Sequence, residues 1–427
     1  MGKLVISRVL LAGLLAALAH PALAQTGTVV PGGLELSFGF SERLEADDNL
    51  PLAITSPGNS TVSTTRLSFA LKSETKTERL SFTASTAVRA AYGSGVTNKG
   101  TNLDDPRFDL AYSRDVGNSV LSVGANYRRS DVQFLRPLSD FLDANGQIIL
   151  PTDASDLTGT GNRTDYGVNG SLAWGVTAPF GVTVSAGASG LTYSQVSNPA
   201  LTDTQRRNIA ANFRLRLNDV TDGNVRLGFD QFENVATANT TNSRTLAIGL
   251  TRQLVDGSLN ATFTARNSAG GTRLGFDVRR DMQLPTGSLG YGVGLTKPDG
   301  GSIGVTGALD WQYQLPQANI SARLNRSVTF NTANVEQLQT TLALGYNQAL
   351  SPRTGMAVNL SYSVADPAGL ANDTTNANFG ASYFIAVTSD WNMSLGYNYN
   401  MRNNDTVGRA NSNSVFLGLS RNFNIRP

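Results

Sequence analysis

The stretch TGSLGYGVGLTKPDGG, Thr286–Gly301, places a glycine at every second position of its central part. The two alternating sets are Gly290, Gly292 and Gly294, and Leu289, Tyr291, Val293 and Leu295. Strict alternation indicates a β-strand, although glycine normally weakens the interior of a strand. The stretch therefore predicts a strand with one large apolar face and one nearly empty face.

The same alternation recurs nearly to the last residue, and helical periodicity is scarce. Many of the segments span roughly ten residues with their flanks, which is the length of a tilted membrane strand. Predicted strands centre near Phe38, Phe69, Ala84, Leu110, Val123, Gly170, Val184, Phe213, Leu227, Ile248, Ala261, Phe276, Val293, Leu309, Ala322, Leu342, Leu360, Ala381, Leu395 and Leu417. We expect about 18–20 strands in one domain.

Two architectures produce this alternation: a soluble sheet with a wet polar face, or a membrane barrel with a lipid-facing apolar face and a polar lumen. The strands are long, and aromatic residues lie near the ends of their apolar sets, as in interfacial girdles. Short connections such as Val255–Gly257 and Thr388–Asp390 also interleave with longer polar ones. These features favour an all-β fold, a transmembrane antiparallel up-and-down β-barrel with one long external loop.

Within a closed barrel every backbone group is paired, which compensates for the weak strand preference of glycine. The inward glycines of Thr286–Gly301 would then either leave the lumen unobstructed or let another segment approach the wall. A Gly-x-Gly phosphate-binding loop is the alternative interpretation, but it requires a following helix, and the sequence predicts none after Thr296.

The first 24 residues differ from the rest. Lys3 and Arg8 precede an apolar run, and Ala22-Leu23-Ala24 ends it. This order predicts a secretory signal peptide, residues 1–24, cleaved after Ala24, and a barrel over residues 25–427. The run is too short for a membrane anchor, which needs about 20 apolar residues.

The signal peptide holds two of the 34 Lys and Arg residues and none of the 32 Asp and Glu residues, so the mature chain has no net charge. This balance gives no indication of nucleic-acid binding. The single histidine, His20, lies in the signal peptide, and the chain has no cysteine. Ser-His catalysis and transition-metal sites built on His or Cys are therefore unavailable, and we expect neither an enzyme nor a cofactor. Asp47 and Asp48, or Asp104 and Asp105, offer oxygen ligands for a hard cation, but paired acids in external loops are usually solvated.

If Leu, Phe and Tyr face lipid, the alternation also identifies the charged residues that line the lumen. The expected inward basic residues are Arg89, Arg107, Arg128, Arg214, Arg216, Arg226, Arg273, Arg279 and Arg323, and the inward acids are Asp109, Asp230, Asp277 and Asp310. Charged rings of this kind set the ion selectivity of a pore. Pairing between strands, as in Arg107/Asp109, would instead brace the wall.

The longest connection, Asp131–Arg163, is the third external loop by this strand count. As a constriction loop it would fold inward and bring Asp140, Asp143, Asp153 and Asp156 toward the basic wall. As a hairpin it would extend the flanking strands and turn at Asn145-Gly146, a strong turn dipeptide. The Asn-Gly pair favours the hairpin. In either arrangement the apolar residues Phe141, Leu142 and Ile148–Leu150 require cover, because exposing them costs about 25 cal/mol per Å².

The end of the chain, NSNSVFLGLSRNFNIRP, resembles the closing strand and assembly signal of Gram-negative outer-membrane barrels. Its outward positions are Val415, Leu417, Leu419 and Arg421, before the terminal aromatic Phe423. The opening LELSFGFSERLEADDNLPL is similar to the first hairpin of uncharacterised β-barrel porins, some of which are linked with polysaccharide export. The resemblance implies a Gram-negative outer-membrane location, with lipid, lipopolysaccharide and the barrel-assembly machinery as partners.

Together these features predict a porin-like channel for passive or weakly selective diffusion of small solutes. Two alternatives remain open: a barrel that assists polysaccharide or other polymer export, and a plugged structural or adhesive surface barrel.

Overall fold

The computed structural model describes residues 33–96, 100–136, 138–143, 146–332, 335–367, 373–405 and 407–426. The predicted signal peptide, residues 1–24, and Asn145 of the predicted turn lie outside these ranges.

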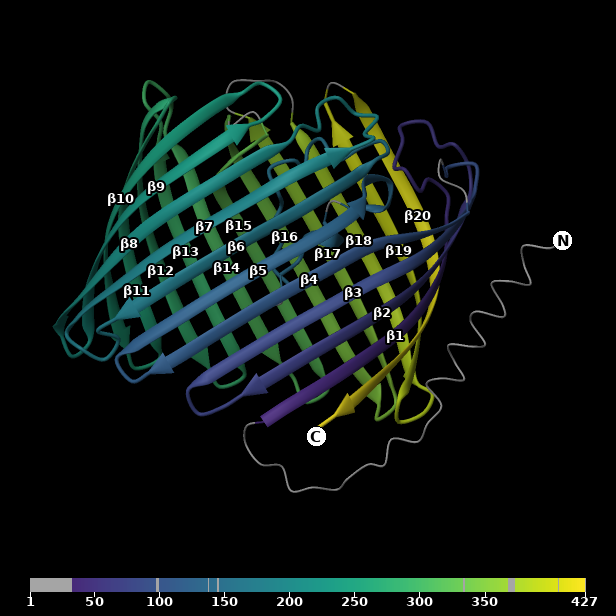
Figure 1. Cartoon of the computed structure of the whole chain (residues 1–427), viewed down its shortest axis with the longest axis horizontal. Coiled ribbons are helices and arrows are strands. Elements are labelled where there is room, and N and C mark those ends of the chain that lie inside the picture. Colours follow the sequence, from purple (N-terminus) through teal and green to yellow (C-terminus); the bar gives the residue numbers. More distant parts are fainter. Residues whose placement is uncertain are drawn as a thin grey trace.

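Twenty strands form a single antiparallel sheet (Figure 1). Their bounds are β1 Gly33–Asp47, β2 Ser60–Glu74, β3 Glu78–Gly93, β4 Gly100–Val116, β5 Ser119–Asp131, β6 Asn162–Trp174, β7 Phe180–Ser194, β8 Thr204–Asn218, β9 Thr221–Asn234, β10 Asn239–Leu254, β11 Gly257–Ser268, β12 Gly271–Leu284, β13 Gly287–Lys297, β14 Gly304–Gln314, β15 Ala318–Phe330, β16 Glu336–Ser351, β17 Thr354–Pro367, β18 Thr374–Ala386, β19 Trp391–Asn404 and β20 Gly408–Ile425. Each strand contains its predicted centre, so the fold class is confirmed at the upper end of the expected strand count.

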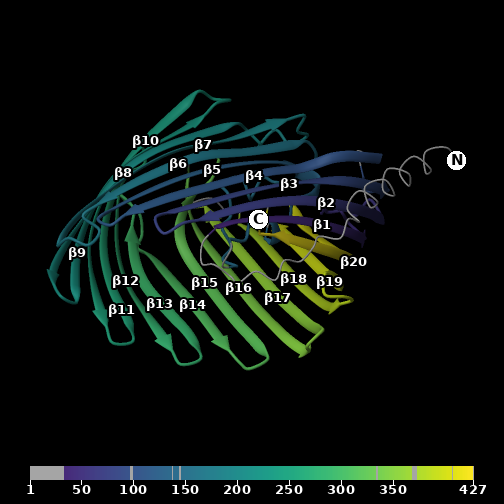
Figure 2. The ribbon, with the colours of Figure 1, turned by 60° about the horizontal axis from the view of Figure 1, so that its bottom comes forward.

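Each strand pairs with its neighbours in the sequence, and β1 pairs with β20 to close the sheet, from Leu36↔Ile425 to Asp47↔Ser414. The strands run obliquely around an enclosed interior (Figure 2). A closed barrel has no free edge and satisfies its backbone groups internally, as the hydrocarbon of a bilayer requires. Apart from the strands, the described chain holds two 3₁₀ turns, Val132–Phe134 and Ser139–Phe141. No helix within the described ranges is long and apolar enough to cross a membrane.

The connections differ in length between the two ends of the barrel. One end carries short turns, such as residues 219–220, 255–256 and 285–286, together with the start of β1 and the end of β20. At the 255–256 turn, Gly257 has φ +148°, and a Cβ there would collide with the Asp281 carbonyl oxygen, so the turn requires glycine. The other end carries the long connections, which barrels of this type place outside the cell. We call these the short-turn end and the external end.

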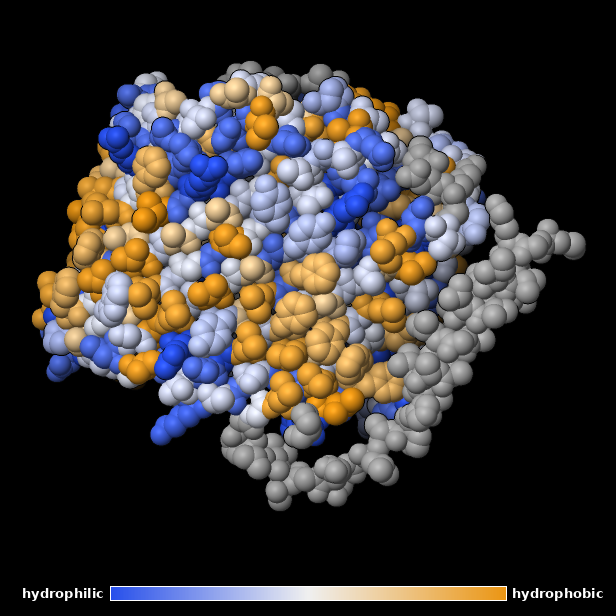
Figure 3. Space-filling view, in the orientation of Figure 1, coloured by the Kyte–Doolittle hydropathy of each residue, from blue (hydrophilic) through white to orange (hydrophobic). Residues whose placement is uncertain are grey.

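Outward and inward residues follow from the register. Phe38 pairs with Phe69 and Phe423, so the apolar sets of successive strands share one surface. Large apolar residues on this surface are exposed, among them Val293 (62%), Leu395 (58%) and Ile248 (51%). Figure 3 shows hydrophobic side chains spread across the strands, with hydrophilic residues gathered toward the external end. The outer surface is thus suited to lipid, and the polar set faces the interior.

Candidate functional site: the lumen and the segment between β5 and β6

The glycines of β13 form a groove in the inner wall that is occupied by charged side chains of β12. A Cβ at Gly290 would lie 2.6 Å from Asp281 Oδ1 and 2.7 Å from Arg279 Nη2. A Cβ at Gly294 would collide with the Asp277 carboxylate. Of the two roles expected for these glycines, close approach is therefore the observed one, and the approaching groups are side chains of the neighbouring strand.

This groove allows Arg279 to reach across β13. Its Nε donates to Asp281 at 2.9 Å, and its Nη2 donates to Asp310 of β14, two strands away, at 2.8 Å. Arg323 of β15 extends the chain of charges, with Nε 3.9 Å from Asp310. Asp277 accepts a 2.9 Å hydrogen bond from Thr306. Alternating charges on β12, β14 and β15, with the glycine groove of β13 between them, form a charge ladder along the inner wall.

A second cluster lies on β2–β5. Arg89 pairs with Asp104, and Arg128 Nε donates to Asp105 at 3.0 Å. Arg66 of β2 also donates to Asp105, at 2.7 Å. The two acids lie within β4 and are buried, so the expectation that they are solvated in an external loop is wrong for this pair.

Asp47 and Asp48 are likewise not solvated loop acids. Asp47 ends β1, is 3% exposed and accepts hydrogen bonds from Ser412. Asp48 accepts from the backbone and side chain of Asn413 at 2.7 and 2.8 Å. Both acids fasten the first external connection to β20.

The wall formed by β8–β12 holds paired and unpaired arginines. Asp230 accepts from Arg206 at 2.6 Å, with Arg266 at 3.9 Å, and Arg273 Nε donates to Glu336 at 2.8 Å. Near the short-turn end, Arg214 Nη2 donates to the carbonyl oxygens of residues 175, 176 and 178 at 2.9 Å each.

Arg214 and Arg216 also lie within 4.0 Å of Asp222. Arg226 is exposed and makes no hydrogen bond or ion pair within the described part of the chain. It is therefore a cation of this wall that an anion in the lumen can reach.

The segment between β5 and β6, residues 132–161, is anchored near its own strands by a buried ion pair. Asp153 is fully buried and accepts from Arg163 Nε at 2.7 Å and from the Tyr193 hydroxyl. Arg163 is itself 3% exposed. A pair desolvated to this extent holds only while both charges and their hydrogen bonds are in place.

An apolar cluster supports this anchor. Val132, Leu135 and Leu157 pack with Leu201 of the β7–β8 connection, against which Phe141 also lies. Of the apolar residues that required cover, Ile148 is 4% exposed, but Leu142 (45%) and Ile149 (59%) remain exposed. The apolar residues of the segment are therefore only partly covered.

The far part of the segment reaches the opposite wall. A Cβ at Gly146 would lie 3.3 Å from Arg323 Nη1. Gln147 and Ile148 line a cavity of about 90 Å³ together with the charge ladder residues Arg279, Asp310 and Arg323. The tip of the segment thus lies against β12–β15 rather than above the barrel.

Further contacts attach the segment around the external end. Arg136 lies 3.4 Å from Asp47, and the Thr332 hydroxyl donates to Asp156 at 3.1 Å. Arg402 of β19 donates to the carbonyl oxygens of Ser155 and Leu157, the latter at 3.3 Å. These contacts come from three separate parts of the wall, so the segment extends across the lumen.

Burial also changes the acid–base properties of the segment. Desolvation raises the pKa of Asp140, and the Arg136 backbone N–H and Arg128 only partly offset it. Burial likewise raises the pKa of Asp156, although Thr332 and Arg402 oppose the change. Asp143 accepts from the backbone N–H of Gln147 at 2.8 Å. Each of the four acids of the segment therefore has a defined partner, and Asp153 forms a buried ion pair with the inward Arg163.

The prediction that β5 and β6 continue as a long hairpin is wrong. Their pairing ends at Asp131↔Asn162. A much smaller hairpin does form, with a bridge between Leu142 and Ile148 and a turn hydrogen bond from Gly146 N to Asp143 O. Asn145 lies outside the described residues, so the predicted turn dipeptide itself stays a prediction. The segment folds inward and finds its partners on the inner wall, as at Arg323 and Arg402, and on the β7–β8 connection, as at Leu201.

Several inward charges were not among the predicted lumen residues, notably Arg66, Arg163, Arg206, Arg266 and Arg402. The same alternation would have identified them, because each occupies a position of the inward parity of its strand. Arg163, Arg206, Arg266 and Arg402 lie toward the external ends of their strands, and Arg66 lies near the middle of β2.

Neither a protein-family model nor a curated protein matches the sequence. Among solved structures, the chain is similar to a mutant of the ferric enterobactin receptor PfeA from Pseudomonas aeruginosa, with 10% identity, a TM-score of 0.49, and 92% and 81% of the two chains covered. It is also similar to a BenF-like porin from Pseudomonas fluorescens Pf-5 (11%, TM-score 0.43, 91% and 99% covered). The chain is similar as well to OccK7 (OpdD) from Pseudomonas aeruginosa, with 10% identity, a TM-score of 0.42, and 93% and 100% of the two chains covered. The closed antiparallel barrel is established by the strand pairing of this chain, and these similarities assign no residue a role.

Proposed function

We propose that this protein is an outer-membrane channel through which small solutes diffuse passively or with weak selectivity. The observation that carries the proposal is a closed barrel of 20 strands with an apolar exterior and a charged interior. Barrels of 16–18 strands already leave an aqueous channel, so 20 strands enclose enough space for one. No catalytic group or cofactor enters this function.

In this proposal the signal peptide is cleaved after Ala24 and the barrel is inserted into the Gram-negative outer membrane. The predicted lumen residues, including Arg226 and the charge ladder from Arg279 to Arg323, form the surface that solutes meet. Residues 132–161 narrow the external half of the passage, and Asp140, Asp143, Asp153 and Asp156 belong to this constriction.

A second candidate, a plugged structural barrel, is favoured by the attachment of residues 132–161. The buried Asp153–Arg163 pair and the contacts of Arg402 and Thr332 hold the segment at several points of the wall. Firm attachment is compatible with a rigid constriction and also with a closed plug.

Single-channel conductance in planar bilayers tests both candidates. The informative variant deletes residues 138–160, and the matched control deletes residues 299–302, which lie in the exposed β13–β14 connection. Open steps of the wild type that grow only in the 138–160 deletion support a constricted channel. A silent wild type and a conducting deletion support the plugged barrel, and silence of all three well-folded proteins overturns the channel.

A further inference from the structure

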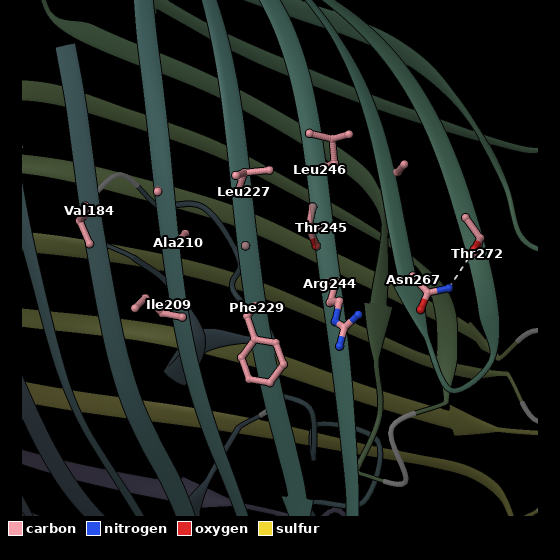
Figure 4. Close-up of a pocket in the computed structure, with 13 residues that line it drawn as sticks. Val184, Ile209, Ala210, Leu227, Phe229, Arg244, Thr245, Leu246, Asn267 and Thr272 are labelled. Carbon is pink, nitrogen blue, oxygen red and sulfur yellow. Dashed lines mark hydrogen bonds between the residues drawn. The ribbon is translucent and has the colours of Figure 1, made fainter.

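An apolar groove of about 640 Å³ lies on the outward surface of β7–β12 (Figure 4). One register row crosses its floor, in the order Val184, Ala211, Leu227, Leu246 and Ala265. The small alanines create the depression between the larger leucines. Because these residues belong to the lipid-facing set, the groove opens toward the membrane and not toward the lumen.

The next row toward the external end changes from apolar to polar. It runs Ile209, Phe229, Arg244, Asn267 and Thr272. Figure 4 shows Phe229 and Arg244 next to each other on neighbouring strands, and the Asn267–Thr272 hydrogen bond of 3.0 Å. The groove therefore has an apolar floor and a polar external rim.

Arg244 is exposed and has no hydrogen-bond or ion-pair partner among the residues the structure describes. Two of the other outward arginines, Arg280 and Arg421, pair with Asp256 and Asp390. A guanidinium at the edge of the hydrocarbon is costly unless it extends to the interface or meets an anion. Arg244 thus calls for an anionic partner from outside the chain.

The residues around Arg244 also favour an anionic partner. Arg207 faces outward one row further along β8, opposite Gln231, which donates to Asn242 at 3.2 Å. The nearest outward acid, Glu233, lies beyond Gln231 on β9 and forms no ion pair within the described ranges. Two cations and several amide and hydroxyl groups therefore border the groove, which suits a phosphate attached to a sugar better than a neutral lipid.

We propose that this groove binds the lipid A part of a lipopolysaccharide molecule in the external leaflet. An acyl chain lies against Leu227 and Leu246 over the alanines, and a phosphate group meets Arg244 and Arg207. The Asn267 and Gln231 amides bond the sugar. The inference rests on the proposed outer-membrane location and goes beyond the channel function, since the groove lies outside the lumen.

Native mass spectrometry of the full barrel in detergent, titrated with purified lipid A, tests the site. The wild type should retain one lipid A tightly, and Arg244→Gln should weaken this binding about tenfold, the effect of losing one charge-assisted hydrogen bond. Ala211→Phe, which fills the groove with an apolar group, should weaken it as well. The matched control is Arg252→Gln, since Arg252 faces outward on the same strand at the short-turn end, opposite Leu259.

Equal lipid A binding by wild type and Arg244→Gln, or equal loss in Arg252→Gln, would overturn the proposal. So would phosphatidylglycerol displacing lipid A at equal concentration, or barrel dimers that Arg244→Gln dissociates, since a phospholipid or a second copy would then be the occupant. Conductance separates this inference from the channel function. A non-conducting barrel that still binds lipid A through Arg244 removes the channel alone, and a conducting barrel indifferent to Arg244→Gln in the titration removes the lipid site alone.

Discussion

Ala261 and Thr262 are neighbours in β11, and they lie in opposite environments. Ala261 faces outward between Leu250 and Val278, while Thr262 faces inward beside Gly249 and Asp277. The outward residue needs only to be apolar, because lipid surrounds it without directional contacts. The inward residue has specific polar neighbours, so the substitutions that it tolerates depend on which charges lie opposite.

The same contrast extends over the whole wall. Outward residues such as Ile248 and Val293 are exposed, and lipid requires of them only that they be apolar. Inward charges are held by partners that are often remote in sequence, as in Arg402 with the Leu157 carbonyl and Arg273 with Glu336. On the outer face each residue must only be apolar in itself, whereas on the inner face a charged residue is accommodated only together with its polar partner.

The largest effect is expected where an inward pair is fully desolvated. Asp153→Asn should destabilise the packing of residues 132–161 by about 3–5 kcal/mol, because Arg163 is left as an uncompensated buried charge. Asp109→Asn is the control, since the Arg107–Asp109 pair is 52% and 38% exposed and such pairs contribute about 0–1 kcal/mol. Urea unfolding in lipid vesicles measures both, and similar losses would show that burial does not distinguish the two pairs.

A charge added to either side of β11 tests the two faces directly. Ala261→Arg should cost about 2–4 kcal/mol of barrel stability if the side chain lies near the bilayer midplane. Thr262→Arg should cost far less, because it faces water in the lumen and lies opposite Asp277. Folding equilibria of both variants in vesicles provide the measurement, and equal costs would mean that the outward and inward assignments are wrong.

The outer face could be predicted from the sequence because its signal is local. Alternation alone located all 20 strands, and the parity of Leu, Phe and Tyr assigned the lipid-facing surface. The inner face could not be predicted to the same depth. No local pattern indicates that Arg279 spans β13 to reach Asp310, or that Gly290 makes room for it.

Residues 132–161 show the limit most clearly. The Asn-Gly signal predicted a turn, and a turn hydrogen bond does join Gly146 to Asp143. The direction of the segment depends on contacts of Asp153, Asp156 and Gly146 with separate parts of the wall. Such contacts combine residues from distant strands, so only the closed barrel brings them together.

A smaller effect is expected on ion selectivity. Because most inward arginines are paired, we expect only a modest anion preference, set chiefly by the unpaired Arg226 and stronger at low salt, where screening lengths exceed about 10 Å. Arg226→Gln should reduce this preference, whereas the outward Arg252→Gln should not. Reversal potentials in a salt gradient measure both, and a clear cation preference of the wild type would show that acids control the passage.

The smallest effect concerns pH. The pKa of Asp140 is raised by burial in the packed segment, so the packed state binds this proton more tightly than the free segment does. The contribution of this group to packing is therefore fully present below the ordinary carboxyl pKa, and it is lost as the pH rises through the raised value. Acidification should hold residues 132–161 more firmly against the wall and shorten open times.

Asp140→Asn imitates the protonated form and should weaken the pH dependence of the open times, while retaining long closures at neutral pH. Asp109→Asn removes an exposed inward carboxylate instead and should leave the pH dependence unchanged. Single-channel recordings from neutral to acidic pH compare the two variants. Asp140 also lies near Asp105, Arg128 and Arg136. An unchanged pH response in Asp140→Asn would therefore assign the titration to another group. It would also show that the charge of Asp140 does not control how firmly residues 132–161 pack against the wall.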